Sequence, residues 1–91
     1  MRNVYLIIEE RYENRDKNIP WNRVIKEVYS NKQKAIDELK NLSDFYKKNQ
    51  DFEDVEMTIN ENKDGIFAAW LRWTDETGRD FIRYIERKTL W

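Results

Sequence analysis

The segment Ile66–Trp73 constrains the fold of this 91-residue chain more than any other, because it is apolar on both parities as far as Arg72. A strand that covers a core on one side only alternates apolar and polar residues with a period of two. The two apolar series here are Phe67, Ala69, Leu71 and Trp73, and Ile66, Ala68 and Trp70. This pattern predicts a sheet with its core on one side. The other side is either a partner or self-association surface, or a second core covered by residues 13–20 or by the Leu90-Trp91 tail.

The remaining patterns predict the order β-β-α-β-β-β. Alternation over residues 4–9 indicates a first strand, and residues 21–29 a second one whose parity is mixed. Ser30 and Gln33 form a capping-box pattern before apolar residues at three- and four-residue spacing, and Asn49 would end this helix in a left-handed cap. Further strands are expected over residues 55–60, 66–73 and 79–88, with turns at 62–65 and 75–78.

We therefore expect one α+β domain over residues 1–91, with a five-stranded, mainly antiparallel sheet and one long helix packed on one face. One helix can cover only one face of such a sheet. The residues predicted to lie under the helix are Phe67, Ala69, Leu71, Trp73, Val55, Met57, Ile59, Val4, Leu6 and Ile8. The residues predicted to remain on the open side are Tyr5, Ile7, Ile66, Ala68, Trp70 and Arg72.

The register of the last strand depends on the turn at residues 75–78. A type I turn with a bulge at Gly78 places Trp73 opposite Phe81 and Trp70 opposite Tyr84, whereas a four-residue loop places Trp70 opposite Arg83. The bulge is favoured because such a turn demands Gly at that position. It also places Arg83 on the core face, which suggests that the last strand is an edge where this side chain reaches water.

Composition excludes several classes of function. The chain has no Cys and no His, which excludes disulfides and the usual zinc sites, and no other metal or cofactor is indicated. The two serines, Ser30 and Ser43, fall at the predicted cap and inside the helix, so no nucleophile–base pair is in view and we expect a protein that is not an enzyme. The apolar run at the N-terminus is too short for a signal sequence or a membrane span, which predicts a cytoplasmic protein without membrane contact.

The predicted partner surface consists of Tyr5, Ile7, Trp70, Arg72 and Tyr84. Trp, Tyr and Arg are the residues enriched in the cores of protein interfaces, which favours binding of another protein or formation of a homodimer. A nucleic-acid or nucleotide site is the alternative, with Arg79, Arg83, Arg87 and Lys88 in contact with phosphates. Against it stands the near balance of charge, with 17 basic and 18 acidic side chains and a formal net charge of −1.

An acidic run lies before and within the third predicted strand, formed by Asp51, Glu53, Asp54 and Glu56. It could attract a basic protein surface or a divalent cation. Its spacing fits no calcium loop, because such a loop needs acceptors at alternate positions around a Gly and a final Glu. A solvated loop is the simpler interpretation.

The segments Val4–Ile8 and Val24–Ile36 resemble a pattern found in small accessory proteins of phages and Gram-positive bacteria. There, two strands, a Ser cap and a Lys-rich helix follow one another. The resemblance covers about half of the chain and concerns structural motifs, so it assigns no functional residue. It implies a phage-type inhibitor, of the anti-CRISPR or anti-defence class, that occupies a protein in the cytoplasm of a bacterial host.

Overall fold

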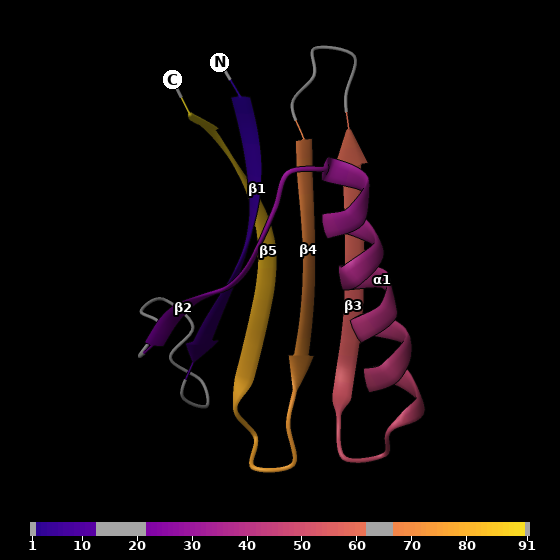
Figure 1. Cartoon of the computed structure of the whole chain (residues 1–91). Helices are drawn as coiled ribbons and strands as arrows, with labels where there is room; N and C mark the ends of the chain where they lie inside the picture. The colour runs from indigo at the N-terminus through magenta and orange to yellow at the C-terminus, as the bar shows by residue number, and fades with distance from the viewer. Residues whose placement is uncertain (1, 13–21, 62–66, 91) are drawn as a thin grey trace.

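The computed structural model describes residues 2–12, 22–61 and 67–90, and it shows one helix packed on a five-stranded antiparallel sheet (Figure 1). The elements are β1 (Arg2–Tyr12), β2 (Asn22–Tyr29), α1 (Lys32–Lys48), β3 (Glu53–Glu61), β4 (Phe67–Thr74) and β5 (Asp80–Leu90). This order confirms the predicted α+β fold. The expected loop at 13–20, the turn at 62–65 and the residues Trp21, Ile66 and Trp91 lie outside the described residues.

Strand order in space is β2-β1-β5-β4-β3, so the last strand of the chain occupies the centre of the sheet. Every neighbouring pair is antiparallel. The expectation that the last strand is an edge is therefore wrong. The edges are β2 and β3, and each is interrupted by a bulge, at Lys26 in β2 and between Glu53 and Glu56 in β3.

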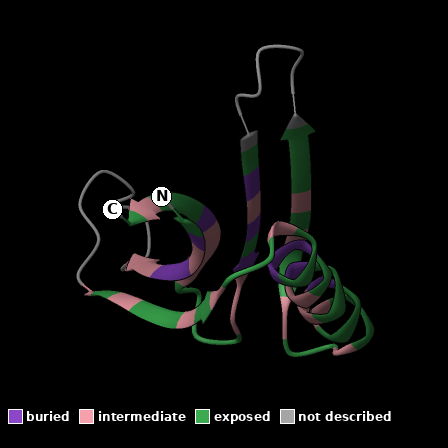
Figure 2. Ribbon diagram, turned by 45° about the horizontal axis from the view of Figure 1, so that its top comes forward, coloured by how far each residue is buried: buried purple, intermediate pink, exposed green. Residues whose placement is uncertain are grey.

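The core lies between α1 and the sheet (Figure 2). Its buried residues are Ile7, Ala35, Ile36, Leu39, Ala69, Leu71, Trp73 and Ile85. At one end of the core the ring of Tyr46 stacks on Trp73 with centroids 4.5 Å apart and contacts Phe52 at 4.6 Å. Each fully buried large side chain contributes roughly 2 kcal/mol through the removal of apolar surface from water.

The β4–β5 turn confirms the favoured register. Gly78 has φ 84°, its amide donates to the carbonyl of Asp75 at 3.1 Å, and Trp70 pairs with Tyr84. The carboxylate of Asp75 accepts from the amides of Thr77 at 2.9 Å and Arg79 at 3.1 Å, which fixes the loop. A residue with a Cβ would be strained at this φ, so glycine is required here.

The predicted parity of β1 is wrong. Ile7 is completely buried beneath α1, and Tyr5 packs against the same cluster, whereas Val4, Leu6 and Ile8 lie on the opposite face. Ile59 has the predicted parity in β3 but stays 41% exposed. The sequence misleads because both parities of β1 are apolar up to Ile8.

The parity of β1 is explained by an ion pair on the helix side of the sheet. Arg83 donates from Nε to Oε1 of Glu9 at 2.8 Å, and Arg11 donates from Nε to Oε2 at 2.9 Å. The side chains of Glu9 and Arg83 are only 4% and 13% exposed. Burial raises the pKa of Glu9, but the hydrogen bonds from the two guanidinium groups outweigh it and leave the pKa below its usual value.

The ends of α1 also differ from the sequence interpretation. Asn31, not Ser30, caps the first turn, with Oδ1 accepting from the amides of Gln33 at 2.8 Å and Lys34 at 3.3 Å. Asn49 ends the helix at φ −101°, in the extended region and not in the left-handed one. Both Ser and Asn suit an N-cap, so the pattern alone places the helix start one residue early.

Candidate functional site

The sheet surface turned away from α1, here called the open face, carries two rows of residues that cross all five strands. The apolar row is Thr58, Trp70, Tyr84, Ile8 and Ile25, from β3 to β2. The charged row is Glu56, Arg72, Ile82, Glu10 and Arg23 in the same direction. Directly paired residues of antiparallel strands project to the same side, so each row forms one continuous strip of surface.

The open face is hollowed over β1, β5 and β2, where aliphatic and charged side chains lie together. Strands β1 and β5 are bowed with the concave side away from α1, while β3 and β4 remain straight (Figures 1 and 2). A groove of about 460 Å³ lies there, lined by Leu6, Ile8, Arg23, Ile25, Glu86 and Lys88. Ile8 is only 2% exposed, but Ile25 and Val28 on the edge strand are 58% and 59% exposed. Large aliphatic side chains left this open on a sheet are typical of a docking surface.

Glu10 organises the polar part of the open face. Its carboxylate accepts from the phenol of Tyr84 at 2.8 Å and from the phenol of Tyr12 at 2.5 Å, and Arg23 Nε lies 3.6 Å from it. The bond to Glu10 raises the pKa of Tyr12 to about 12, since ionisation would place two negative charges side by side. Burial, together with the same carboxylate, raises the pKa of Tyr84. Both phenols are therefore neutral donors with fixed orientation.

Arg72 lies at the centre of the β4 side of the open face and is exposed. It lines two depressions, one with Tyr12, Phe81 and Ile82, the other with acidic side chains of β3. Among the described residues no carboxylate forms an ion pair with it. An exposed guanidinium beside a Trp is available to a carboxylate of a binding partner.

The structure brings together three of the five predicted partner residues. Trp70, Arg72 and Tyr84 lie side by side on the open face, as expected from the favoured register. Tyr5 and Ile7 do not, because they belong to the core under α1.

Sequence reasoning missed Ile25, Val28 and Glu10. The bulge at Lys26 shifts the parity of β2, so that Ile25 and Val28 share the open face although they are three positions apart in the chain. Arg83 could have provided the signal for the parity of β1, since a core-facing Arg requires a carboxylate and Glu9 supplies it.

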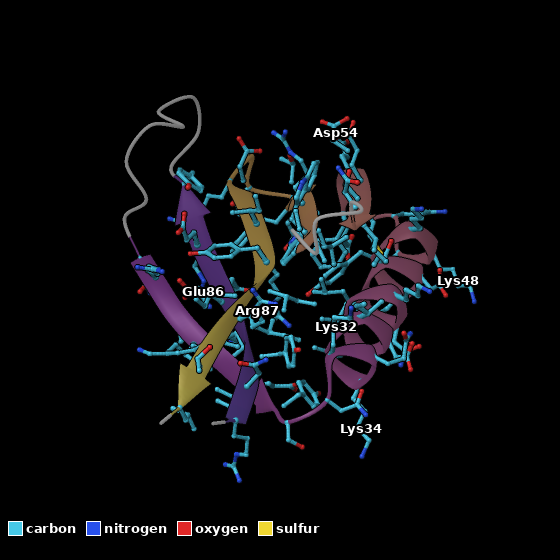
Figure 3. The ribbon with its side chains drawn as sticks, turned by 90° about the horizontal axis from the view of Figure 1, so that it is seen from above. Lys32, Lys34, Lys48, Asp54, Glu86 and Arg87 are labelled. Carbon is cyan, nitrogen blue, oxygen red and sulfur yellow. The ribbon has the colours of Figure 1, made fainter. Side chains whose placement is uncertain are left out.

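The predicted basic strip is divided by the fold. Arg83 is held on the helix side of the sheet by its ion pair with Glu9, and Arg79 belongs to the turn before β5. Lys88 pairs with Val4 on the open face, whereas Arg87 lies on the helix side. Figure 3 shows the same division for the neighbours Glu86 and Arg87, which project from opposite sides of β5. These four cations do not form one surface for a phosphate backbone.

Other chemistry finds little support among the described residues. They contain no group of three or more carboxylates, His or Cys that could hold a metal ion, and the acidic side chains of residues 51–56 are no exception. The helix within this part of the chain lacks the length and apolar character needed to cross a membrane.

Comparison of the chain with protein-family models, with curated proteins and with solved structures found no match.

Proposed function

We propose that this protein is a binding module whose open face occupies the surface of another protein. The observation that supports the proposal is one sheet surface that carries Ile25 and Val28, both more than half exposed, together with Trp70, Tyr84 and Arg72, and that is hollowed beside Ile25. The guanidinium of Arg72 has no carboxylate partner within the described part of the chain. Interfaces place this set of residue types at their centre, where aromatic and Arg side chains contribute most of the binding energy.

The resemblance to small phage-type accessory proteins suggests a host protein as the partner. Steric occupation of its working surface, in the manner of an anti-defence inhibitor, needs no catalytic group on this chain. A cytoplasmic location accompanies this proposal. Such an inhibitor would act stoichiometrically, and its effect would titrate with the partner concentration.

The experiment uses this protein to capture a binding partner from a bacterial lysate, and compares a variant of the open face with a variant of the opposite side of the molecule. Trp70→Ala removes the central anchor of the open face, and Lys40→Glu alters the exposed outer side of α1 as the control. A captured protein should be retained by Lys40→Glu and lose about 2 kcal/mol or more of affinity, roughly thirtyfold, with Trp70→Ala. Circular dichroism confirms that both variants fold. If Trp70→Ala binds the same protein as tightly as the parent, the open face is not the binding surface.

A further inference from the structure

In the charged row of the open face, each charge on one side of the middle residue is matched by the opposite charge at the same distance on the other side. From β3 to β2 it reads acidic Glu56, basic Arg72, apolar Ile82, acidic Glu10 and basic Arg23. Ile82 belongs to β5, which is also the central strand of the sheet. Positions equally distant from β5 on its two sides therefore carry opposite charges.

A two-fold axis along β5 would place every charge of this row opposite a charge of the other sign. In a symmetric dimer the same patch meets itself, so that residue i contacts residue j of the second copy and j contacts i. Rotation about an axis parallel to β5 lays β3 of one copy over β2 of the other, and β4 over β1. Glu56 then faces Arg23 of the second copy, and Arg72 faces Glu10. Each of these two contacts occurs twice, and Ile82 meets itself on the axis.

The apolar row fits the same symmetry. Tyr84 lies on the axis, and Trp70 is carried over Ile8 of the second copy. Ile8 forms the floor of the 460 Å³ groove, which the bowed β1 and β5 create. An indole from the second copy would fill that hollow, and Thr58 of the second copy would lie over Ile25. Sheets that pack face to face interdigitate side chains in this way at about 10 Å separation.

The face is better suited to self-association than either sheet edge. The bulge at Lys26 interrupts the ladder of β2, and β3 carries a bulge with Asp54 at φ 53° together with acidic side chains. Bulges and charges of this kind prevent strand-to-strand pairing between molecules. Two copies would therefore meet through the sheet surface and not through a continuous sheet.

We propose that the open face of this chain binds the open face of a second copy about a two-fold axis along β5, with Glu56 opposite Arg23 and Arg72 opposite Glu10. The dimer does not depend on a host partner, since its evidence is the self-complementarity of the two rows. It adds a regulatory consequence, because a second copy and a host protein would compete for the same surface.

A reciprocal charge swap tests this arrangement. Arg23→Glu places a second carboxylate opposite Glu56 twice in each homodimer, and Glu56→Arg places a second guanidinium opposite Arg23 twice. Each variant alone should weaken the dimer about tenfold or more, because like charges are forced together. An equimolar mixture should restore it, since the heterodimer has one natural pair and one reversed pair. The measurement is sedimentation equilibrium at micromolar concentration.

The exposed outer side of α1 provides the control, and Lys40→Glu should sediment as the natural chain does. Recovery in the mixture also proves that both variants are folded, which circular dichroism checks independently. A natural chain that sediments as a monomer, or single variants as dimeric as the parent, would overturn the proposed dimer. If the equimolar mixture of Arg23→Glu and Glu56→Arg stays monomeric, the two-fold axis does not lie along β5. None of these results alters the lysate capture experiment, which tests the host partner separately.

Discussion

Glu9 links the neighbouring strands β1 and β5 on the helix side of the sheet, because its buried carboxylate accepts hydrogen bonds from Arg83 of β5 at 2.8 Å and from Arg11 of β1 at 2.9 Å. Glu9→Gln leaves the guanidinium of Arg83 buried without a counter-charge. We expect the free energy of unfolding to fall by on the order of 3 kcal/mol, since breaking one side of a buried pair leaves an uncompensated charge. Urea denaturation measures this loss, and the exposed Glu76→Gln should change stability by less than about 0.5 kcal/mol. Equal effects of both substitutions would contradict a structural role for the pair.

The same carboxylate makes stability depend on pH. The pKa of Glu9 is lower in the folded protein than its usual value of 4.5, so the unfolded chain takes up the proton first. The stabilisation that the ionised carboxylate of Glu9 provides is complete above the usual pKa of this group. It disappears as the pH falls through the lower pKa that Glu9 has in the folded protein. The difference in urea midpoint between the natural chain and Glu9→Gln should therefore narrow as the pH falls below about 4.5. A difference that stays constant down to about pH 3 would show that ionisation of Glu9 plays no part.

The phenol of Tyr12 provides a second test at this scale. Its pKa of about 12 results first from the hydrogen bond to Glu10, so Glu10→Gln should lower the pKa of Tyr12 towards its usual value of 10.0. Absorbance at the tyrosinate band, followed through alkaline pH, measures the shift as the difference between the two proteins. Glu86→Gln, on the neighbouring strand, leaves the bond from Tyr12 to Glu10 intact and serves as the control. An unchanged titration in Glu10→Gln would remove Glu10 as the organising residue of the open face.

These residues also show what the sequence could predict. The turn at Gly78 predicts the register of β5 correctly, and with it the positions of Trp70, Arg72 and Tyr84. The parity of β1 is not predictable in this way, because burial of Glu9 depends on Arg83, 74 positions away, and a period-two pattern contains no information about such a pair. Charge in a strand normally indicates solvent exposure, whereas here it is neutralised inside the core.

At the scale of the helix, Asn31 is the residue that satisfies the free amides of the first turn. Asn31→Ala should destabilise the protein by about 1 kcal/mol, because the amides of Gln33 and Lys34 lose their acceptor. Ser30→Ala is the matched control, one residue earlier, and should be nearly neutral. Thermal unfolding followed by circular dichroism compares the two. If Ser30→Ala destabilises the protein more than Asn31→Ala does, the N-cap is Ser30, as the capping-box pattern predicts.

At the scale of the hairpin, Gly78 determines how β4 and β5 align. Gly78→Ala forces a Cβ into φ 84° and should cost about 1 kcal/mol of stability. Glu76→Ala, in the same turn but exposed, should cost far less. Chemical denaturation measures both. Because the position of Trp70 opposite Tyr84 follows from this turn, an alternative loop in the variant would also alter the open face.

At the scale of the molecule, the bulge in β2 and the central place of β5 follow from pairings between distant segments, and for that reason the sequence could not predict them. The parity of Ile25 and Val28 depends on the bulge, and the balance of the charged row depends on β5 lying in the middle. Local patterns specify each strand, but only the assembled sheet shows which side chains become neighbours. The open face is thus a property of the topology.

A dimer formed through the open face makes stability depend on protein concentration. Association of folded chains stabilises them by mass action, because unfolded chains lack the sheet surface that pairs. The Tm of the natural chain should therefore rise as its concentration increases through the dissociation constant, whereas the Tm of Arg23→Glu should stay constant over the same range. Differential scanning calorimetry at matched concentrations measures both, with Lys40→Glu expected to follow the natural chain. A Tm of the natural chain that is independent of concentration, in a sample shown by sedimentation to be dimeric, would mean that the dimer survives unfolding and is not built on this sheet.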